Sequence, residues 1–238
     1  MKNKLILDID TDVTELLGII KYEKPIPANM TGIMKGNFPS FIPKTDETRI
    51  QGLTREYTSY KNHDGKYYAA EKLEGSSITQ YFNIDKFGVC SRNIDLQKPD
   101  NIEENTFWKV TEQLDIENKI KDLGLNIALQ GELIGEGIQG NIYKIKGQTI
   151  RYYNVFDIDK REYYDLDKFK SFITDLGLQT VPILDEDFVL PDTIQELVQL
   201  ADGESQLHNC LREGLVIRSH DRTISFKSIS NKYLNNEK

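Results

Sequence analysis

The chain has 238 residues, and its 30 Lys and Arg against 38 Asp and Glu give a formal net charge of −8. This balance argues against a nucleic-acid binder that works through bulk positive charge. With 38% hydrophobic and 29% charged residues, the composition is typical of a globular protein with a sizeable core.

The negative charge is concentrated in one stretch. Residues 171–211 hold eight of the 38 acids and no Lys or Arg, so the rest of the chain has equal numbers of acids and bases. A basic surface for an anionic partner is therefore possible outside this stretch, although the chain as a whole is acidic.

The cysteines and apolar runs predict a soluble protein of a reducing compartment. Cys90 and Cys210 are too few for a disulfide framework, and the three histidines are too dispersed for a zinc motif. No apolar run is long enough for a signal peptide or a membrane span. We therefore expect a cytoplasmic protein, in a host cytoplasm if a virus encodes it, with no membrane partner.

The first segment of the chain is expected to be separate from the rest. A short amphipathic helix is predicted over residues 12–21, and Pro25 and Pro27 indicate a linker behind it. This divides the chain into an N-terminal segment with its linker, 1–24, and a single domain, 25–238.

Strand and helix signals are mixed along that domain. The helix predicted over 104–122 has apolar residues on both sides, so it is either buried on two sides or broken midway, and Gly124 follows its end. Asp192 is the expected N-cap of a later helix, with Gln195 completing a capping box. The fold class is α+β, because the strands show no regular βαβ alternation. The predicted strands are 67–70, 87–90, 126–134, 141–156, 214–218 and 223–227, and the predicted helices are 104–122, 166–176 and 192–200.

A glycine-rich segment, 135–140, fits the pattern G-x-G-x-x-G. A dinucleotide-binding loop requires a helix directly afterwards, whereas 141–145 is strand-like. A protein-kinase loop would lie between strands, but no HRD or DFG motif follows. We interpret the segment as a glycine-rich turn between strands.

Lys72 begins a K-x-x-G sequence, the core of the lysine nucleophile motif of covalent nucleotidyltransferases. Lys121 and Lys144 begin the same pattern, so the tetrapeptide alone decides nothing. Lys72 differs from them because it follows a strand-like run and because five further segments come after it. These segments are 91–93, 130–133, 152–158, 212–218 and 226–230.

Each of these segments taken alone has a structural explanation, with Glu213 and Arg218 as strand-end charges, Phe156 as core and Lys227 as a solvated base. Their order carries more weight. The ordered set resembles nucleotidyltransferase motifs I, Ia, III, IIIa, IV and V of ATP-dependent polynucleotide ligases. The upstream stretch 36–47 and the terminal stretch 229–234 look like RNA ligases of the Deinococcus and Naegleria type.

The resemblance runs from about residue 17 to residue 234. It implies a nucleotidyltransferase domain of antiparallel sheets flanked by helices. It also implies an RNA ligase with a role in RNA repair, which forms a lysyl-AMP, transfers the AMP to a 5′-phosphate RNA end and seals that end to a 3′-OH. The implied partners are RNA ends or a nicked duplex with a 3′-OH and a 5′-phosphate. A monomer is expected.

The resemblance also assigns roles to individual residues. Lys72 is the expected nucleophile, which needs cationic neighbours or a metal because a free lysine amine is mostly protonated at neutral pH. Lys227 is the candidate contact to the α-phosphate. Arg92 should hold a phosphate, and Arg49 is a further candidate for the same work.

The remaining roles concern the metal and the adenine. Glu213 and Glu132 resemble the carboxylates that act through a divalent cation, and hard oxygen ligands suit Mg²⁺ or Mn²⁺. Phe156 is expected to stack on one face of the adenine of ATP, with Val216 on the other face and Glu71 near the exocyclic amine.

Two departures from the family pattern are visible. Ser77 stands where many related ligases have Asn, so a contact made by that Asn is in doubt. The residues before Pro25 are too few for the OB domain that members of this branch carry there. We expect a truncated or a naturally minimal ligase, in which lysyl-AMP formation survives better than strand sealing.

Two alternatives remain open from the sequence. One is a catalytically silent module that binds RNA ends. The other keeps the covalent lysine but changes the nucleotide or the product, as in GTP-dependent capping enzymes or DNA ligases.

Overall fold

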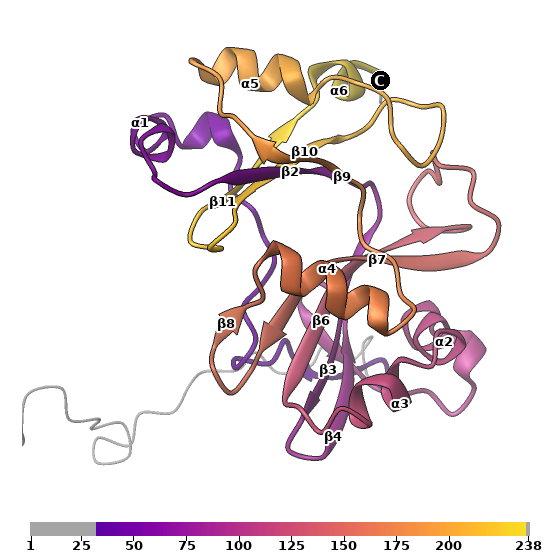
Figure 1. Cartoon of the computed structure of the whole chain (residues 1–238). Helices are drawn as coiled ribbons and strands as arrows, with labels where there is room; N and C mark the ends of the chain where they lie inside the picture. The colour runs from indigo at the N-terminus through magenta and orange to yellow at the C-terminus, as the bar shows by residue number, and fades with distance from the viewer. Residues whose placement is uncertain (1–31, 237–238) are drawn as a thin grey trace, which may run out of the picture. The chain divides into compact units, whose positions relative to one another are not determined.

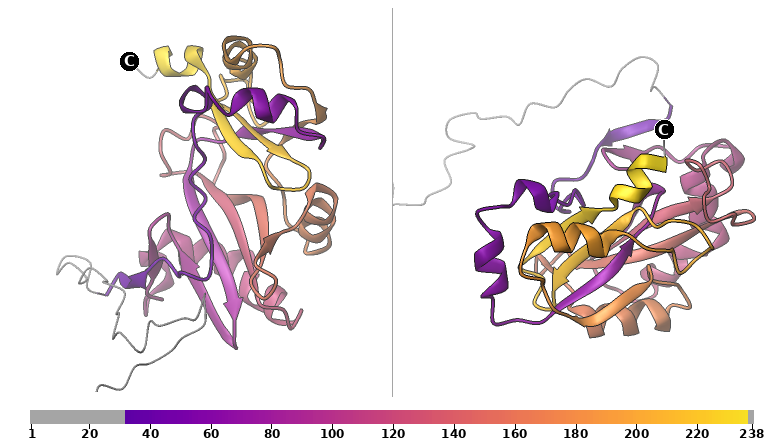
Figure 2. Two further views of the ribbon diagram at one scale, coloured as in Figure 1. Left: turned by 90° about the vertical axis from the view of Figure 1, so that its left-hand side faces the viewer. Right: turned by 90° about the horizontal axis from the view of Figure 1, so that it is seen from above.

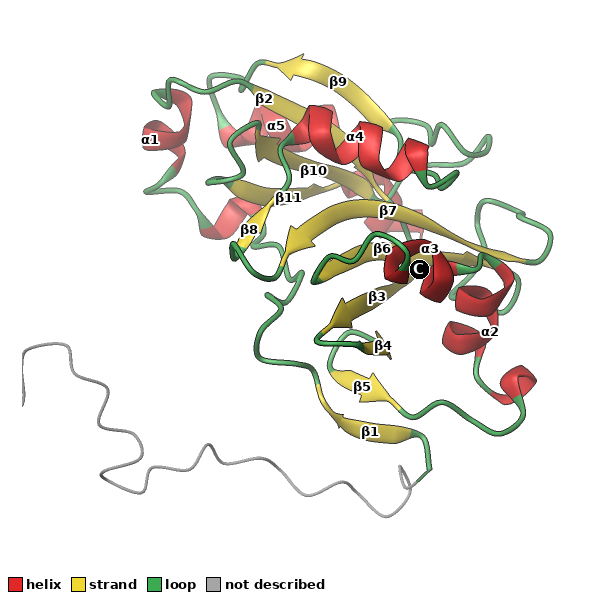
Figure 3. Cartoon of the chain, turned by 60° about the horizontal axis from the view of Figure 1, so that its bottom comes forward, coloured by secondary structure: helices red, strands yellow, loops and turns green. Residues whose placement is uncertain are grey.

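Two antiparallel sheets form the core of the structure, a computed structural model that describes residues 32–236 (Figure 1). Figure 3 shows the strand order of the larger sheet. In sheet order, the larger sheet contains β1 (Met34–Asn37), β5 (Ile94–Leu96), β4 (Lys86–Cys90), β3 (Ser76–Asn83), β6 (Ile127–Gly135), β7 (Gln148–Asp157) and β8 (Glu162–Tyr163). The smaller sheet contains β11 (Ser225–Ile229), β10 (Gly214–Ser219), β2 (Tyr67–Lys72) and β9 (Ile183–Phe188).

Helices pack on both sheets, which confirms the α+β class. The helices are α1 (Tyr57–Lys61), α2 (Thr106–Gln113), α3 (Ile116–Lys121), α4 (Leu166–Asp175), α5 (Ile194–Ala201) and α6 (Asn231–Asn236), with short 3₁₀ helices at Ile50–Gly52 and Ile102–Glu104. The pair α2 and α3 packs on β3 and β4, and α4 packs on β7. Figure 2 shows the orange helix α5 lying over the smaller sheet, where it contacts β11.

Some expectations fall outside the described residues. The helix predicted over 12–21, the linker prolines and the domain boundary between residues 24 and 25 all lie there, so the domain division stays a prediction. No helix in residues 32–236 is long and apolar enough to cross a membrane.

The helix predicted over 104–122 is broken midway. Asn105 caps α2 by accepting hydrogen bonds from the amides of Phe107 and Trp108. Asp115 then takes a left-handed conformation at φ 53°, and α3 starts at Ile116. The break turns the second half of the segment, so that Val110 of α2 and Ile116 of α3 enter the same core.

Two other element boundaries differ from the predictions. The strand predicted over 141–156 begins only at Gln148, because Asn141 and Lys144 have positive φ angles that a strand excludes. The later helix begins at Ile194 and not at Asp192. Its N-cap is Thr193, which forms a capping box with Glu196 and not with Gln195.

The last two strands lie near their predicted positions, whereas the short strands β1, β5 and β8 and the strand β9 were not predicted. β10 matches its prediction, whereas β11 begins two residues late, since Asp221 accepts hydrogen bonds from the amide and hydroxyl of Thr223 within the turn. The acidic stretch also contains β9, an edge strand whose charged residues face solvent and hide the strand signal.

Candidate active site

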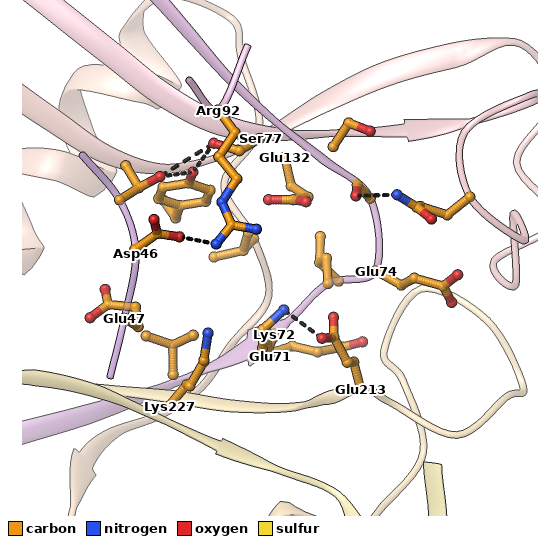
Figure 4. A pocket seen from close by; sticks show the side chains of 18 of the residues that line it. Asp46, Glu47, Glu71, Lys72, Glu74, Ser77, Arg92, Glu132, Glu213 and Lys227 are labelled. Carbon is orange, nitrogen blue, oxygen red and sulfur yellow. Dashed lines mark hydrogen bonds and ion pairs between the residues drawn. The ribbon is translucent and has the colours of Figure 1, made fainter. Parts of the chain in front are cut away.

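A cavity of about 740 Å³ lies between the two sheets, a size that suits a nucleotide (Figure 4). The smaller sheet lines it with residues of β2, β10 and β11, and the larger sheet with residues of β3, β6 and β7. Eight of the nine residues that the sequence assigned to the site line this cavity, namely Arg49, Glu71, Lys72, Arg92, Glu132, Glu213, Val216 and Lys227.

Lys72 stands where the chain crosses from one sheet to the other. It is the last residue of β2, and β3 begins in the other sheet at Ser76. The turn between them requires a glycine, because a Cβ at Gly75 would lie 2.5 Å from the carbonyl oxygen of Leu133 and 2.7 Å from Cγ of Glu132. The K-x-x-G sequence is therefore a tight crossover that places the lysine at the cavity.

Glu213 is the direct partner of Lys72. Its Oε1 lies 2.6 Å from Nζ of Lys72, and both side chains are mostly buried. The register explains the contact, since Gly214 of β10 pairs with Lys72 of β2 and Glu213 directly precedes it. Burial raises the pKa of the Glu213 carboxyl, and the positive charge of Lys72 opposes this rise.

Glu132 faces the same space from β6 in the larger sheet (Figure 4). Burial raises its pKa to about 8; the charges of Lys72 and Arg92 oppose this rise, and that of Glu213 adds to it. Two carboxyl groups thus approach Lys72 from different sheets.

Glu132 and Glu213 suit a metal ion whose remaining ligands come from the substrate and from water. Among residues 32–236, no cluster of three or more His, Cys, Asp or Glu side chains forms a metal site by itself. Mg²⁺ commonly binds through one or two carboxylates together with substrate phosphates and water. Glu132 and Glu213 match that pattern.

Cations gather on the β11 side of the cavity. Lys227 lies on β11, and the backbones of Lys227 and Arg49 meet in an isolated bridge. Burial and the neighbouring charges of Lys72 and Arg49 lower the pKa of Lys227. Within the described part of the chain, neither the Lys227 ammonium nor the Arg49 guanidinium has a hydrogen bond or ion pair. Unpaired positive charges of this kind suit an anionic ligand.

Arg92 lies closer to solvent. It forms an ion pair of 2.6 Å with Asp46, in which both side chains are more than half exposed. This pair joins the loop after β4 to the segment before the first 3₁₀ helix. The guanidinium can exchange Asp46 for a phosphate at little cost, because exposed ion pairs contribute only about 0–1 kcal/mol.

Glu71 lines the cavity and is almost fully buried. Its Oε2 accepts a hydrogen bond of 2.9 Å from the amide of Gln206, whereas its Oε1 is buried with no hydrogen-bond partner in the described structure. Burial raises the pKa of this carboxyl, and hydrogen bonds from Ser205 and Gln206 oppose the rise. A ligand that brings a hydrogen-bond donor, such as an amino group, would satisfy Oε1.

Phe156 does not line the cavity, which disagrees with the expectation that it stacks on adenine. It is buried in a separate apolar cluster with Ile42 and Tyr163. Tyr153, three residues earlier on the same strand, lines the cavity instead. Nothing in the spacing of the aromatic residues distinguished the two.

Tyr153 is held from several sides. Its hydroxyl lies within 3.3 Å of the hydroxyls of Ser77 and Thr45, and the Arg218 guanidinium lies 5.7 Å from its ring centre. Arg218 is itself buried and paired with Glu47 at 2.9 Å. Ser77 therefore helps to position an aromatic ring of the cavity.

Comparisons with known proteins agree with this geometry. A family profile described as RNA ligase matches residues 65–234. Solved structures of the Naegleria gruberi RNA ligase are 40% identical with a TM-score of 0.80, among them a mutant with AMP and Mn, which covers 95% of this chain and 67% of that chain. A mutant with ATP and Mn covers 96% and 67%, and the ligase with PPi covers 96% and 68%. A comparison with curated protein sequences finds no match.

Proposed function

The chain belongs to the RNA ligase family, and we propose that it is an ATP-dependent RNA ligase that forms a covalent lysyl-AMP at Lys72. The observation that carries the proposal is the position of Lys72, at a sheet crossover inside a nucleotide-sized cavity, with Glu213 at 2.6 Å. Neither Lys121 nor Lys144, which begin the same tetrapeptide, lines that cavity.

The first step joins Lys72 to AMP. The amine of Lys72 attacks the α-phosphorus of ATP, a nitrogen–phosphorus bond forms, and the bond to the bridging oxygen breaks, with its electron pair leaving on pyrophosphate. Lys72 must lose a proton to attack, and Glu213 is close enough to accept it. Lys227 and Arg49 are free to stabilise the charge on the phosphate oxygens.

The residues present fit ATP and a divalent cation. Tyr153 and Val216 supply apolar contacts for the faces of a purine base, and the unpaired Oε1 of Glu71 suits its amino group. Glu132 and Glu213 would hold Mg²⁺ or Mn²⁺, which supplies positive charge at the phosphate oxygens. The relatives with ATP or AMP and Mn support this choice of ligands.

RNA ends are the proposed second substrate. The AMP passes from Lys72 to a 5′-phosphate, and attack by a 3′-OH then seals the strand and releases AMP. Arg92, which lines the cavity with its side chain more than half exposed, is the proposed contact to the 5′-phosphate. A monomeric state and a cytoplasmic location stay predictions.

Intact-mass measurement tests the proposal. Incubation with ATP and Mg²⁺ or Mn²⁺ should add one AMP to the wild-type protein and to Lys121→Ala, but not to Lys72→Ala. Absence of the adduct from the wild type would favour the silent RNA-end binding module. Addition of GMP from GTP, or sealing of DNA as efficient as sealing of RNA, would instead favour a nucleotidyltransferase of another specificity.

A further inference from the structure

The glycine-rich loop between β6 and β7, residues 136–147, contains none of the residues that take part in the proposed reaction. It joins two neighbouring antiparallel strands, a connection that usually takes about two to five residues. Gln139, Asn141 and Lys144 in this loop have positive φ angles although none of them is a glycine. Such conformations cost free energy and persist only where surrounding contacts hold them.

The loop contacts the turn that follows Lys72. The amide of Glu74 donates a hydrogen bond of 2.7 Å to the hydroxyl of Tyr143, and the amide of Gly140 donates one of 3.1 Å to Oε1 of Glu74. The side chain of Gln139 reaches the carbonyl oxygen of Gly75 at 3.4 Å. Three loop residues thus hold two of the three residues between Lys72 and β3.

Tyr143 anchors these contacts in the apolar core. Tyr143 is 3% exposed and is packed in the main apolar core, where burial raises its pKa. The ends of the loop are tied by a hydrogen bond of 2.7 Å from the amide of Glu136 to the carbonyl oxygen of Gly147. The side chain of Asn141 further bonds both backbone groups of Ile145.

The same contacts argue against a phosphate-binding loop. A loop of that kind points free backbone amides at its ligand. Here the amide of Glu136 bonds Gly147, the amide of Ile138 bonds Gly135, and the amide of Gly140 bonds Glu74. These amides are committed within the protein.

We propose that this loop is a positioning device for the nucleophile, in which Tyr143 and Gly140 fix the turn after Lys72 and thereby aim its amine into the cavity. The proposal rests on the function proposed for Lys72. Tyr143 is a positioning residue, because it touches the turn and not the reacting atoms. A small displacement of a reacting group slows a reaction strongly without weakening substrate binding to the same degree.

Tyr143→Phe tests this directly, with Tyr57→Phe as the matched control. The hydroxyl of Tyr57 donates a bond of 2.9 Å to the carbonyl oxygen of Pro191, away from the cavity. Lysyl-AMP formation at saturating ATP should be about tenfold slower in Tyr143→Phe than in the control. The ATP concentration for half-maximal rate should change by less than about twofold, and both variants should have similar melting temperatures. Equal rates in the two variants would overturn the proposal.

A second readout does not depend on catalysis. The Glu74 amide should exchange with solvent deuterium faster in Tyr143→Phe than in the wild type, and Tyr57→Phe should leave that exchange unchanged. If the wild type forms no adduct, the proposed function fails, while this exchange still tests the loop contact. Unchanged exchange in Tyr143→Phe would remove the positioning role.

Two Glu74 variants distinguish the hydrogen bond to the loop from the negative charge of the Glu74 carboxylate. Glu74→Gln keeps an oxygen that can accept the Gly140 amide, whereas Glu74→Ala removes it. The rate of adduct formation should stay within about threefold of wild type in Glu74→Gln and fall about tenfold or more in Glu74→Ala. Equal losses in both variants would show that the carboxylate charge matters and would contradict the anchoring role.

Discussion

Lys72 and Glu213 meet at 2.6 Å because their strands pair in the smaller sheet, so that the end of β2 and the start of β10 lie side by side. The ion pair therefore belongs to the sheet register and not to a mobile surface. Its two members come from segments far apart in the sequence, and Glu132 reaches the same point from the other sheet.

Glu213→Gln should preserve the fold and slow lysyl-AMP formation by about a hundredfold. The amide keeps the size of the carboxylate but removes both the proton acceptor beside Lys72 and the charge that holds a cation. Single-turnover adduct formation measures the loss. Glu204→Gln, at an exposed position, is the control and should react at the wild-type rate.

Lys227→Gln should lower the rate of adduct formation about tenfold to a hundredfold without lowering the melting temperature of the ATP-free protein. In the described structure Lys227 forms no ion pair within 4 Å; burial and the charges of Lys72 and Arg49 disfavour its ammonium form, and those of Asp46 and Glu213 only partly oppose this effect. Removing it relieves repulsion and leaves no broken ion pair behind. A large fall in thermal stability would contradict this reading of the site.

Tyr153 and Phe156 should respond oppositely to replacement by leucine. Tyr153→Leu removes an aromatic face of the cavity and should raise the ATP concentration for half-maximal adduct formation about tenfold. Phe156→Leu should leave that concentration unchanged but lower the free energy of unfolding by about 1 kcal/mol, since the ring is buried in a separate cluster. ATP titration and denaturant unfolding of both variants check the contrast.

Asp221 should make stability depend on pH in the acid range. Hydrogen bonds from Ser219 and Thr223 lower its pKa from 3.8 to about 2. A carboxyl whose pKa is lower in the folded state than in the unfolded state stabilises the protein at every pH above its unfolded-state pKa. This contribution is lost as the pH falls from about 4 through 2. Because the group is half exposed, the contribution at pH 7 should be only about 1 kcal/mol.

Denaturant unfolding of Asp221→Asn measures this dependence. The variant should be less stable than the wild type by about that amount at pH 7, and the difference should shrink steadily as the pH is lowered from 5 towards 2. Asp100→Asn, at an exposed position, serves as the control. A difference that stays constant with pH would show that the asparagine acts through the geometry of the turn and not through charge.

Much of the fold follows from local patterns. The strands 67–72, 86–90 and 127–135 and helix α4 lie close to their predicted positions, because short apolar runs or periodic apolar residues mark them. The break at Asp115 and the cap at Thr193 could not be located from such patterns. The break follows from the left-handed backbone of Asp115, which makes no side-chain cap, and the start of α5 follows from Thr193 accepting a hydrogen bond from the amide of Glu196. Asp192 and Thr193 are both suitable capping residues, so composition alone does not choose between them.

By itself, the sequence determined the chemistry of this protein: the order of its motifs identified the ligase resemblance and singled out Lys72 among three K-x-x-G lysines. Only the tertiary structure decided that Tyr153, and not Phe156, faces the cavity. Tyr153 lies at a bulge in β7, where the register with Gln130 and Gly131 shifts. A bulge breaks the two-residue alternation of a strand, so the facing of residues beside it cannot be read from spacing. The hydrogen bonds between the glycine-rich loop and the turn after Lys72 are likewise contacts between distant segments, which no local pattern records.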